Sequence, residues 1–304
     1  IEEEQNGAER AEYGKKILKE LSKRLTLEFG KGFSVENLDR MRYFYKVYSE
    51  ANSSTLLTNS NEQHSLTEMK QLFPEFSLSW SHYLKLMRIQ NSGERNFYEI
   101  EASANNWSLR EMIRQIDSEL YTRLALSKDK KGIKQLSQKG QIIEKPTDAI
   151  KDPYILEFLG LPEKHHYSET DLENEIINKL EYFLLELGKG FTFVARQKRI
   201  TFDERHFYID LVFYNRILRC FVLIDLKIGD LKHQDLGQIQ MYVNYYDRYV
   251  KLEDENATIG IVLCKDKSQT LVEISLPENN QQIFASRYQT ILPSKKQLVD
   301  LLEQ

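Results

Sequence analysis

The sequence predicts a two-domain α+β protein, in which an all-helical N-terminal domain over residues 1–148 precedes an α/β domain with a mixed sheet over residues 149–304. Apolar residues recur at helical spacing in the first half, whereas strand-like apolar runs alternate with amphipathic helices in the second. Between the halves lies a basic, glycine-containing segment, 127–141, followed by Pro146 and Pro153, and this change of composition is typical of a domain boundary. A chain of 304 residues with 41% hydrophobic residues is long and apolar enough for each domain to bury its own core.

The first half contains start and stop signals for a series of helices. Gly30 and Gly32 end the first helix, and Ser34 caps the second. Two capping boxes, Ser65–Glu68 and Ser108–Glu111, each open a further helix, because the first and fourth side chains satisfy each other's free backbone N–H groups. The predicted helices cover residues 8–28, 35–48, 65–73, 79–89 and 108–126, with a polar loop over 53–64 and a turn at Gly93.

The second half alternates between helices and strands. Its first amphipathic helix ends at Gly188 and Gly190, and strand-like runs rich in aromatic and β-branched residues follow. A helix separates the first three strands from a later β-rich run, which is the order expected of an α/β core with a mixed sheet. The predicted helices cover 170–187, 235–249 and 295–302, and the predicted strands cover 191–197, 207–214, 219–227, 258–264 and 283–291.

Charge, cysteine use and hydropathy restrict the class of protein. The net charge of −4 divides into +1 over residues 1–150 and −5 over the remainder, so composition neither favours nor excludes a nucleic-acid partner. Cys220 and Cys264 lie inside apolar runs without partners for a zinc site or a disulfide framework, which indicates core thiols in a reducing compartment, the cytoplasm. No run of about 18 apolar residues is present, so we expect no membrane span. No secretory leader is visible, and because the chain starts at Ile1 rather than Met we expect a missing natural N-terminus.

Two carboxylates lie inside consecutive apolar strands of the second half. Asp210 is flanked by apolar neighbours in strand 207–214, and Asp225 is similarly flanked in strand 219–227, two residues before Lys227. A carboxylate in such a strand costs several kcal/mol of desolvation unless it is paired or binds a cation. Oxygen ligands suit Mg²⁺ (or Mn²⁺), which would polarise a phosphate oxygen and activate water while Lys227 orients that water.

The same three residues also allow a structural interpretation, a buried ion pair of Lys227 with Asp225 or Asp210. Such pairs seldom add net stability, which makes this costly arrangement a poor purely structural device. The strand register is a difficulty for the metal hypothesis. A tight two-residue turn at Asn215 and Arg216 would place Asp210 opposite Phe221, so the carboxylates meet only through a wider loop, a bulge or a strong twist.

The motif Asp210-(x14)-Asp225-Leu-Lys227 resembles the PD-(D/E)xK nuclease signature, and Gln238-Ile-Gln-Met-Tyr242 resembles the QxxxY element of its RecB-like branch. Longer segments resemble the bacterial YhcG family across nearly the whole chain, among them GKGFSVENLDRMRYFY, WSLREMIRQI and FYIDLVFYNRILRCFVLIDLKIG. The resemblance implies a helical N-terminal domain joined to a restriction-endonuclease-like PD-(D/E)xK domain. It also implies an association with mobile elements and restriction-type loci.

Carried over by position, the resemblance makes Asp210 and Asp225 metal ligands and Lys227 catalytic, although the family usually has Glu in place of Asp225. The family's acidic residue on the first core helix corresponds to Glu173. Helical spacing supports this assignment, because Glu173 shares a face with apolar residues whereas Glu175 lines up with Lys179. As an alternative, Thr170–Glu173 forms a capping box and Glu173 only caps the helix.

Three further polar residues could reach the same site. Gln238 and Tyr242 share a helix face and could contact the substrate backbone or a metal-bound water, while aromatic packing explains Tyr242 equally well. Gln197 follows an apolar strand, and we interpret it as a solvated strand end rather than a residue that faces the site.

The N-terminal helices contain basic residues interleaved with aromatic ones, a pattern typical of a helix-turn-helix-like DNA reader. The candidate nucleic-acid-binding residues are Arg40, Arg42, Arg110 and Arg114, with 108–126 as the candidate recognition helix. A bundle with solvated charges and core aromatics is an equally good interpretation, and a third is that the helices assemble a homo-oligomer.

The predicted function is therefore a Mg²⁺-dependent endonuclease that hydrolyses DNA phosphodiester bonds, linked to mobile elements or restriction and defence. The alternatives are a catalytically silent nucleic-acid-binding module on a nuclease-like fold, and an assembly protein dominated by its N-terminal helices. A silent module would normally have lost Asp225 or Lys227, and this chain keeps both.

Overall fold

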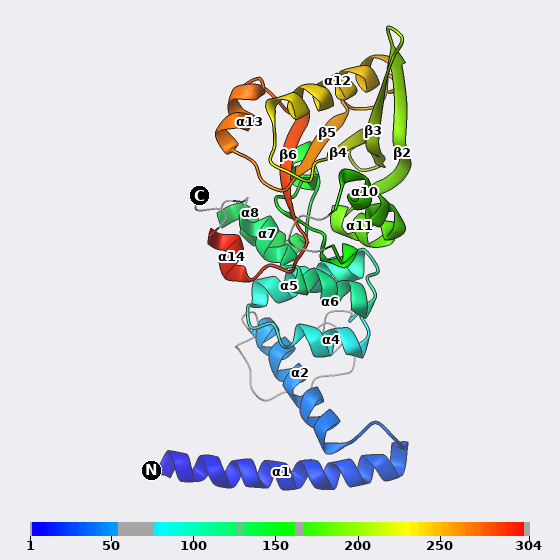
Figure 1. Cartoon of the computed structure of the whole chain (residues 1–304). Coiled ribbons are helices and arrows are strands. Elements are labelled where there is room, and N and C mark those ends of the chain that lie inside the picture. Colours follow the sequence, from blue (N-terminus) through cyan, green and yellow to red (C-terminus); the bar gives the residue numbers. More distant parts are fainter. Residues whose placement is uncertain (1, 54–75, 127, 129, 162–166, 301–304) are drawn as a thin grey trace. The chain divides into compact units, whose positions relative to one another are not determined.

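The computed structural model describes residues 2–53, 76–126, 128, 130–161 and 167–300 (Figure 1). The chain forms two compact units, 1–95 and 96–304, and each is described by itself. No helix within the described ranges is long and apolar enough to cross a membrane. The predicted helix that opens at Ser65 lies outside the described residues.

The first unit is helical, as predicted. Ser34 caps the second helix, because its hydroxyl accepts a hydrogen bond from the Asn37 amide at 3.2 Å. Helix α2 packs on α4 through edge-to-face aromatic contacts, in which the Phe44 ring lies 5.5 Å from Trp80 and 5.4 Å from Tyr83. The helices are α1 (Glu2–Phe29), α2 (Val35–Ser53) and α4 (Trp80–Leu86).

Short helices lead into the second unit. The capping box Ser108–Glu111 is confirmed, but the predicted helix 108–126 is interrupted at Ser118 and Glu119, where Glu119 adopts a left-handed φ of 55°. Two further helices differ from the prediction: the turn expected at Gly93 lies inside α5, and the basic segment predicted as a domain boundary contains α8. The helices are α5 (Ser92–Ala104), α6 (Leu109–Asp117), α7 (Leu120–Leu126), α8 (Lys130–Lys139) and α9 (Pro146–Ala149).

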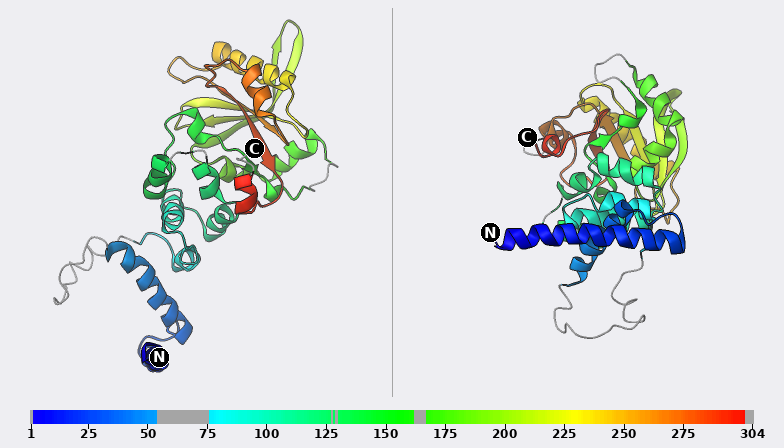
Figure 2. Two further views of the ribbon diagram at one scale, coloured as in Figure 1. Left: turned by 90° about the vertical axis from the view of Figure 1, so that its left-hand side faces the viewer. Right: turned by 90° about the horizontal axis from the view of Figure 1, so that it is seen from below.

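A six-stranded mixed sheet forms the centre of the second unit (Figure 2). Its order is β1-β6-β5-β4-β3-β2, with antiparallel pairing from β2 to β4 and parallel pairing from β4 to β1. The two-residue strand β1 was not predicted. The strands are β1 (Tyr154–Ile155), β2 (Phe191–Phe202), β3 (Arg205–Asn215), β4 (Cys220–Leu226), β5 (Ile259–Cys264) and β6 (Ile283–Gln289).

Helices cover both faces of this sheet. Strand side chains alternate between two cores, so Val222 and Ile224 pack beneath α10 and α11, whereas Leu223 packs beneath α12. The cysteines predicted to be core thiols, Cys220 and Cys264, are free and buried. The helices are α10 (Glu169–Asn178), α11 (Leu180–Leu187), α12 (His233–Tyr249), α13 (Gln269–Ser275) and α14 (Lys295–Asp300), and a 3-10 turn, η1, spans Glu157–Leu159.

The helix predicted over 170–187 is two helices, because Lys179 leaves helical geometry at φ −122° and ψ 36°. The capping box is also displaced from its predicted place. Ser168 and Asp171 form it, with the Ser168 amide donating to Asp171 at 2.7 Å. Glu173 is therefore not a capping residue and is free for another role.

A buried ion cluster ties α6 and α7 to α11. The Glu186 carboxylate is fully buried and accepts hydrogen bonds from Arg123 at 2.5 Å, Arg114 at 3.2 Å and the Ile155 amide at 3.0 Å. Burial alone would raise the pKa of Glu186, but Arg123, Lys151 and Arg114 lower it to about 2. Helices of the first half of the chain thus belong to the compact unit that contains the sheet. The boundary after residue 148 was predicted between two functional domains, whereas the division after residue 95 separates two compact units. The functional boundary therefore stays a prediction.

Candidate active site

The β3–β4 register brings Asp210 and Asp225 together. Four residues, 216–219, connect the strands, Asn215 pairs with Cys220, and Leu211 pairs with Ile224. Continued by one position beyond that pair, this register would set Asp210 opposite Asp225, and the Asp210 charge contributes to the raised pKa of Asp225. The wide connection needs a residue in left-handed geometry, Arg219 with φ 50°. It resolves the difficulty that a two-residue turn would have created.

The Asp210 side chain forms hydrogen bonds where the pairing of β3 with β4 ends. Oδ2 accepts a hydrogen bond from the Leu226 amide at 2.8 Å, and Oδ1 accepts one from Gln197 at 3.0 Å. The Asp210 carboxylate is thereby fixed in orientation beside the last residue of β4.

Asp225 and Lys227 form a close ion pair. Lys227 Nζ lies 2.8 Å from Asp225 Oδ2, and Asp225 is only 1% exposed. Burial raises the pKa of Asp225 to about 7, with Lys227 opposing the rise and Asp210 adding to it. For Lys227, burial lowers the pKa, but the carboxylates of Asp225, Glu169 and Asp210 outweigh burial, so the net pKa is raised. Lys227 is therefore a cation at neutral pH.

Glu173 points inward from α10, as predicted, and is 4% exposed. Oε2 accepts a hydrogen bond from Gln197, and Oε1 lies 2.9 Å from Arg196 Nε. Glu175, the other acid of the helix, pairs with Lys179 at 3.4 Å near the surface. The orientation of both side chains follows from helical spacing.

Gln197 is exposed, as predicted, but it lies inside β2 rather than at a strand end and links Glu173 to Asp210. Its Nε2 donates to both carboxylates, so the amide lies between them. A register shift between Phe193 and Ala195 makes this possible, because the shifted pairing puts Gln197 opposite Asp210. Gln197 has a left-handed φ of 45°. No sequence signal available from a single chain reveals such a bulge.

Gln238 and Tyr242 are joined to each other and to β3. Gln238 Nε2 donates to the Tyr242 hydroxyl at 2.6 Å, and that hydroxyl donates to the Tyr208 carbonyl at 3.0 Å. Burial raises the pKa of Tyr242, which is 1% exposed, and the charges of Asp225 and Asp210 raise it further. Through the Tyr208 carbonyl, this pair is tied to the strand that holds Asp210.

Two carboxylate oxygens of the cluster bear on whether it fits a divalent cation. Two of its buried oxygens, Glu173 Oε1 and Asp225 Oδ2, accept no hydrogen bond from a described residue and have only ionic contacts. Carboxylate oxygens are suitable ligands for a hard cation, although Arg196 and Lys227 pair with these two in this structure. In the part of the chain described, however, no three acidic, His or Cys side chains lie close enough together to hold an ion. The Gln197 amide lies between Glu173 and Asp210 and donates a hydrogen bond to each.

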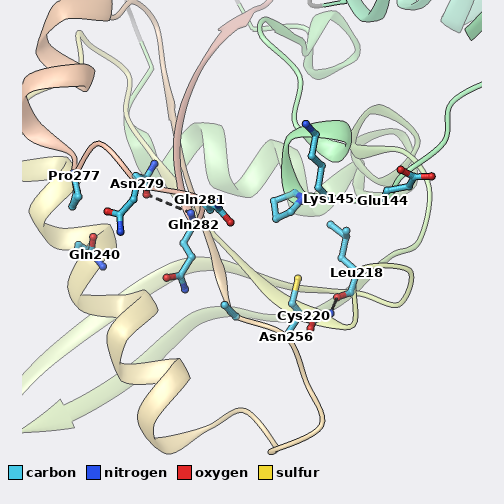
Figure 3. A pocket seen from close by; sticks show the side chains of 13 residues that line it. Glu144, Lys145, Leu218, Cys220, Gln240, Asn256, Pro277, Asn279, Gln281 and Gln282 are labelled. Atoms are coloured by element: carbon cyan, nitrogen blue, oxygen red, sulfur yellow. Dashed lines mark hydrogen bonds between the residues drawn. The ribbon is translucent and has the colours of Figure 1, made fainter. Parts of the chain in front are cut away.

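A separate cavity of about 760 Å³ lies at the amino ends of β4 to β6 (Figure 3). Cys220, Ala257 and Gln282 mark those strand starts, and side-chain amides line much of the cavity. Asp225 and Lys227 lie at the carboxyl end of β4. None of the predicted site residues lines this cavity.

Comparison with known families fits this geometry. A domain described as "YhcG PDDEXK nuclease domain" matches residues 147–303, and a "DUF1016 N-terminal domain" matches residues 1–123. The chain belongs to the YhcG family. Over 314 residues it is 38% identical to the protein named "Putative nuclease YhcG" of Escherichia coli (strain K12), covering 99% of this chain and 83% of that protein. In this YhcG-family chain, Asp210, Asp225 and Lys227 all fall inside the matched nuclease domain.

Solved structures resemble the YhcG-family chain only weakly. The "crystal structure of a repair endonuclease from Pyrococcus abyssi" matches at 18% identity and a TM-score of 0.29, over 43% of this chain and 50% of that chain. The "Structure of EndoMS-dsDNA2 complex" matches at 16% identity and a TM-score of 0.30, over 44% and 50%. The chain thus spans about half the length of these solved chains.

Arg110 and Arg114, the two N-terminal candidates within the second unit, contact residues other than the three carboxylates of the site. Arg114 is committed to Glu157 and Glu186, and its side chain is only 9% exposed, which leaves little surface for a phosphate. The Arg110 guanidinium lies 5.5 Å from the centre of the Tyr182 ring. In the first unit, Arg42 pairs with Asp39 at 2.6 Å, and Arg40 is exposed.

Proposed function

We propose that this protein is a divalent-metal-dependent endonuclease that hydrolyses phosphodiester bonds in DNA. The observation that carries the proposal is that Asp210 and Asp225 directly flank the last pair of the β3–β4 ladder, Leu211 with Ile224, while Lys227 lies 2.8 Å from the Asp225 carboxylate. Membership of a family whose C-terminal domain is described as a PDDEXK nuclease supports it.

The roles of the residues follow from their contacts. Asp210, Asp225 and Glu173 would hold Mg²⁺ or Mn²⁺, for which the Gln197 amide must give way between Glu173 and Asp210. When bound, the ion supplies Lewis-acid activation of a phosphate and of water. Lys227, a cation at neutral pH, orients the attacking water and offsets the negative charge that develops on the phosphate. Gln238 and Tyr242 act by positioning β3.

A substrate panel tests the proposal. Supercoiled, linear duplex and single-stranded DNA, with RNA counterparts, would be incubated with Mg²⁺ or Mn²⁺ and with chelator. We expect DNA cleavage that requires the ion and is abolished by Asp210→Asn and by Lys227→Ala, with circular dichroism showing retained folding. Glu175→Gln, a change of the neighbouring outward-facing acid, is the matched control. Unaltered cutting by either active-site variant would refute the assignment.

Calorimetry separates this enzyme from a catalytically silent module. Titration with Mn²⁺ should release or absorb heat that Asp210→Asn removes, whereas a silent module gives no such difference. The cytoplasmic location and the link to mobile elements or restriction belong to the same proposal. So does homo-oligomer formation through α1, which exposes Ile17 and Leu21 one turn apart and is testable by light scattering with Leu21→Lys.

A further inference from the structure

The β2–β3 hairpin extends beyond the body of the sheet as an arm, defined here as residues 198–209 (Figures 1 and 2). Strand β4 pairs with β3 only from Leu211 onward, so the two strands of the arm pair only with each other. Asp203 and Glu204 form its tip, both with positive φ, 49° and 62°. Such a two-residue turn matches the right-handed twist of a hairpin.

One face of the arm is held against α12. Ile200 and Ile209 are buried in the core beneath that helix, and Phe202 stacks on Phe207 at 4.8 Å. The Tyr242 hydroxyl adds a hydrogen bond to the carbonyl of Tyr208 in the arm. The arm is therefore fixed in place before any partner arrives.

The opposite face of the arm is open to solvent. Arg199 pairs with Tyr208 and Thr201 pairs with His206 across the ladder, and all four residues are exposed. Thr201 Oγ1 and His206 Nδ1 lie 2.9 Å apart, which fixes the ring of His206. These pairs alternate with the pairs packed on α12, so their side chains point away from that helix.

This open face leads directly to the carboxylate cluster. Arg199 and Tyr208 each lie two residues from the facing pair Gln197 and Asp210. Thr201 and His206 each lie four residues from that pair, which corresponds to about 13 Å along the strand. A linear polymer with its reactive bond at Asp210 would therefore pass along the open face.

The charge of the arm fits an anionic polymer. Arg199, the cation of the open face, forms no ion pair with a described residue, whereas Arg114, Arg123 and Arg287 elsewhere in the unit each have a carboxylate partner. Lys198 and Arg205 pair across the ladder with Ile209 and Phe202 and so belong to the face toward α12, and with Asp203 and Glu204 at the tip the arm has three cations against two acids. Arg199 lies in the acidic half of the chain, two residues from Gln197 and near three carboxylates that would repel a phosphate backbone. Local cations of this kind determine whether a phosphate backbone can approach.

We propose that the open face of the arm binds the sugar–phosphate backbone of duplex DNA beside the bond to be cleaved, with Arg199 contacting a phosphate and Tyr208 the adjoining sugar. This inference rests on the proposed nuclease function. The grooves of B-DNA admit a two-stranded ribbon, whereas the deep, narrow groove of duplex RNA does not. Hydroxyl and imidazole groups such as those of Thr201 and His206 add contacts that set the position of the backbone.

Binding without turnover tests the arm. Fluorescence anisotropy would be measured on a short labelled DNA duplex in chelator and in Ca²⁺, over a series of salt concentrations. We expect Arg199→Ala to weaken binding about tenfold and to reduce the slope of log affinity against log salt by about one. Tyr208→Ala weakens binding with an unchanged salt slope. Arg216→Ala, an exposed arginine at the other end of β3, is the matched control and binds as the wild type does.

The outcomes separate the arm from the catalytic assignment. If the wild type cleaves DNA and both arm variants bind and cleave as it does, the arm proposal is overturned and the nuclease stands. If Arg199→Ala loses binding while no DNA is cleaved with any ion, the arm stands and the nuclease proposal fails. A labelled RNA duplex is measured in the same assay. If Arg199→Ala weakens binding of the RNA duplex but not of the DNA duplex, the proposal is also overturned. Unchanged thermal unfolding of each variant establishes that folding is intact.

Discussion

The amide of Gln197 faces the carboxylate of Asp210 across the β2–β3 ladder, with Nε2 3.0 Å from Oδ1, and donates a second hydrogen bond to Glu173. Without a cation, two carboxylates this close repel each other, and the amide offsets that repulsion. Gln197 thus occupies the space that an ion shared by Glu173 and Asp210 would take.

Replacement of Gln197 should therefore make stability depend on the metal. We expect Gln197→Ala to lower the metal-free free energy of unfolding by about 1 kcal/mol, because the buried Glu173 carboxylate and the half-buried Asp210 carboxylate lose their donor. Saturating Mn²⁺ should recover most of this loss in thermal unfolding. Gln240→Ala, which removes a surface amide bonded to Asn244, is the control. An equal loss with and without Mn²⁺ would contradict this role.

The burial of Asp225 predicts a stability that falls as pH rises. Its folded pKa of about 7 lies above the ordinary 3.8, so the native state binds the proton more tightly than the unfolded chain. The resulting stabilisation is fully present below pH 3.8 and is lost as the pH rises through 7. The full effect is on the order of 4 kcal/mol, at about 1.4 kcal/mol for each pKa unit.

Chemical denaturation of metal-free wild type and Asp225→Asn across this pH range isolates the effect, because other groups cancel in the difference. We expect the variant to be more stable than the wild type at pH 8 by about 2 kcal/mol, since Lys227 loses its partner and part of the gain is offset. A difference that does not change with pH would show that Asp225 is ionised in the native state throughout.

The Glu186 cluster should dominate the stability of the second unit. Removing one partner from a buried, hydrogen-bonded ion pair costs about 3–5 kcal/mol, so Glu186→Gln should lower the free energy of unfolding by that order. Glu181→Gln, an exposed change in the same helix, should alter it by less than about 0.5 kcal/mol. Similar urea midpoints for the two variants would rule out a structural role for the cluster.

Tyr242 should act through its hydroxyl and not through its ring. Tyr242→Phe keeps the buried ring but removes the hydrogen bonds to Tyr208 and Gln238. We expect calorimetric Mn²⁺ affinity to stay unchanged and DNA cleavage to slow about tenfold, which is about 1.4 kcal/mol. Tyr246→Phe is the matched control, since this buried tyrosine lies on the same helix and its hydroxyl forms no hydrogen bond with a described residue. Equal cleavage rates would leave Tyr242 with a packing role only.

Local patterns were sufficient for most elements and for the central site residues. Asp210 and Asp225 stand out because each interrupts an apolar strand, and this contrast needs no knowledge of the fold. The inward direction of Glu173 follows from helical spacing alone. The mixed sheet follows from the order of helices and strands.

What the sequence could not reveal depends on contacts between distant segments. The four-residue connection after Asn215 sets the register that aligns Asp210 with Asp225, and the bulge near Val194 brings Gln197 into the site. The break at Lys179 allows α10 and α11 to take separate directions. Arg114 was predicted as a DNA contact. The sequence could not show its ion pair with the buried Glu186, because Glu186 lies 72 residues away along the chain.

The Glu186 cluster also constrains how the nuclease half can be inherited. The matched nuclease domain begins at residue 147, yet both arginines that neutralise Glu186 come from helices before it. A gene fusion or deletion that transferred residues 147–303 alone would leave Glu186 with Lys151 as the remaining one of the three cations that lower its pKa. Relatives that possess only this half should therefore have an uncharged residue at position 186, or a new cation encoded within the half itself.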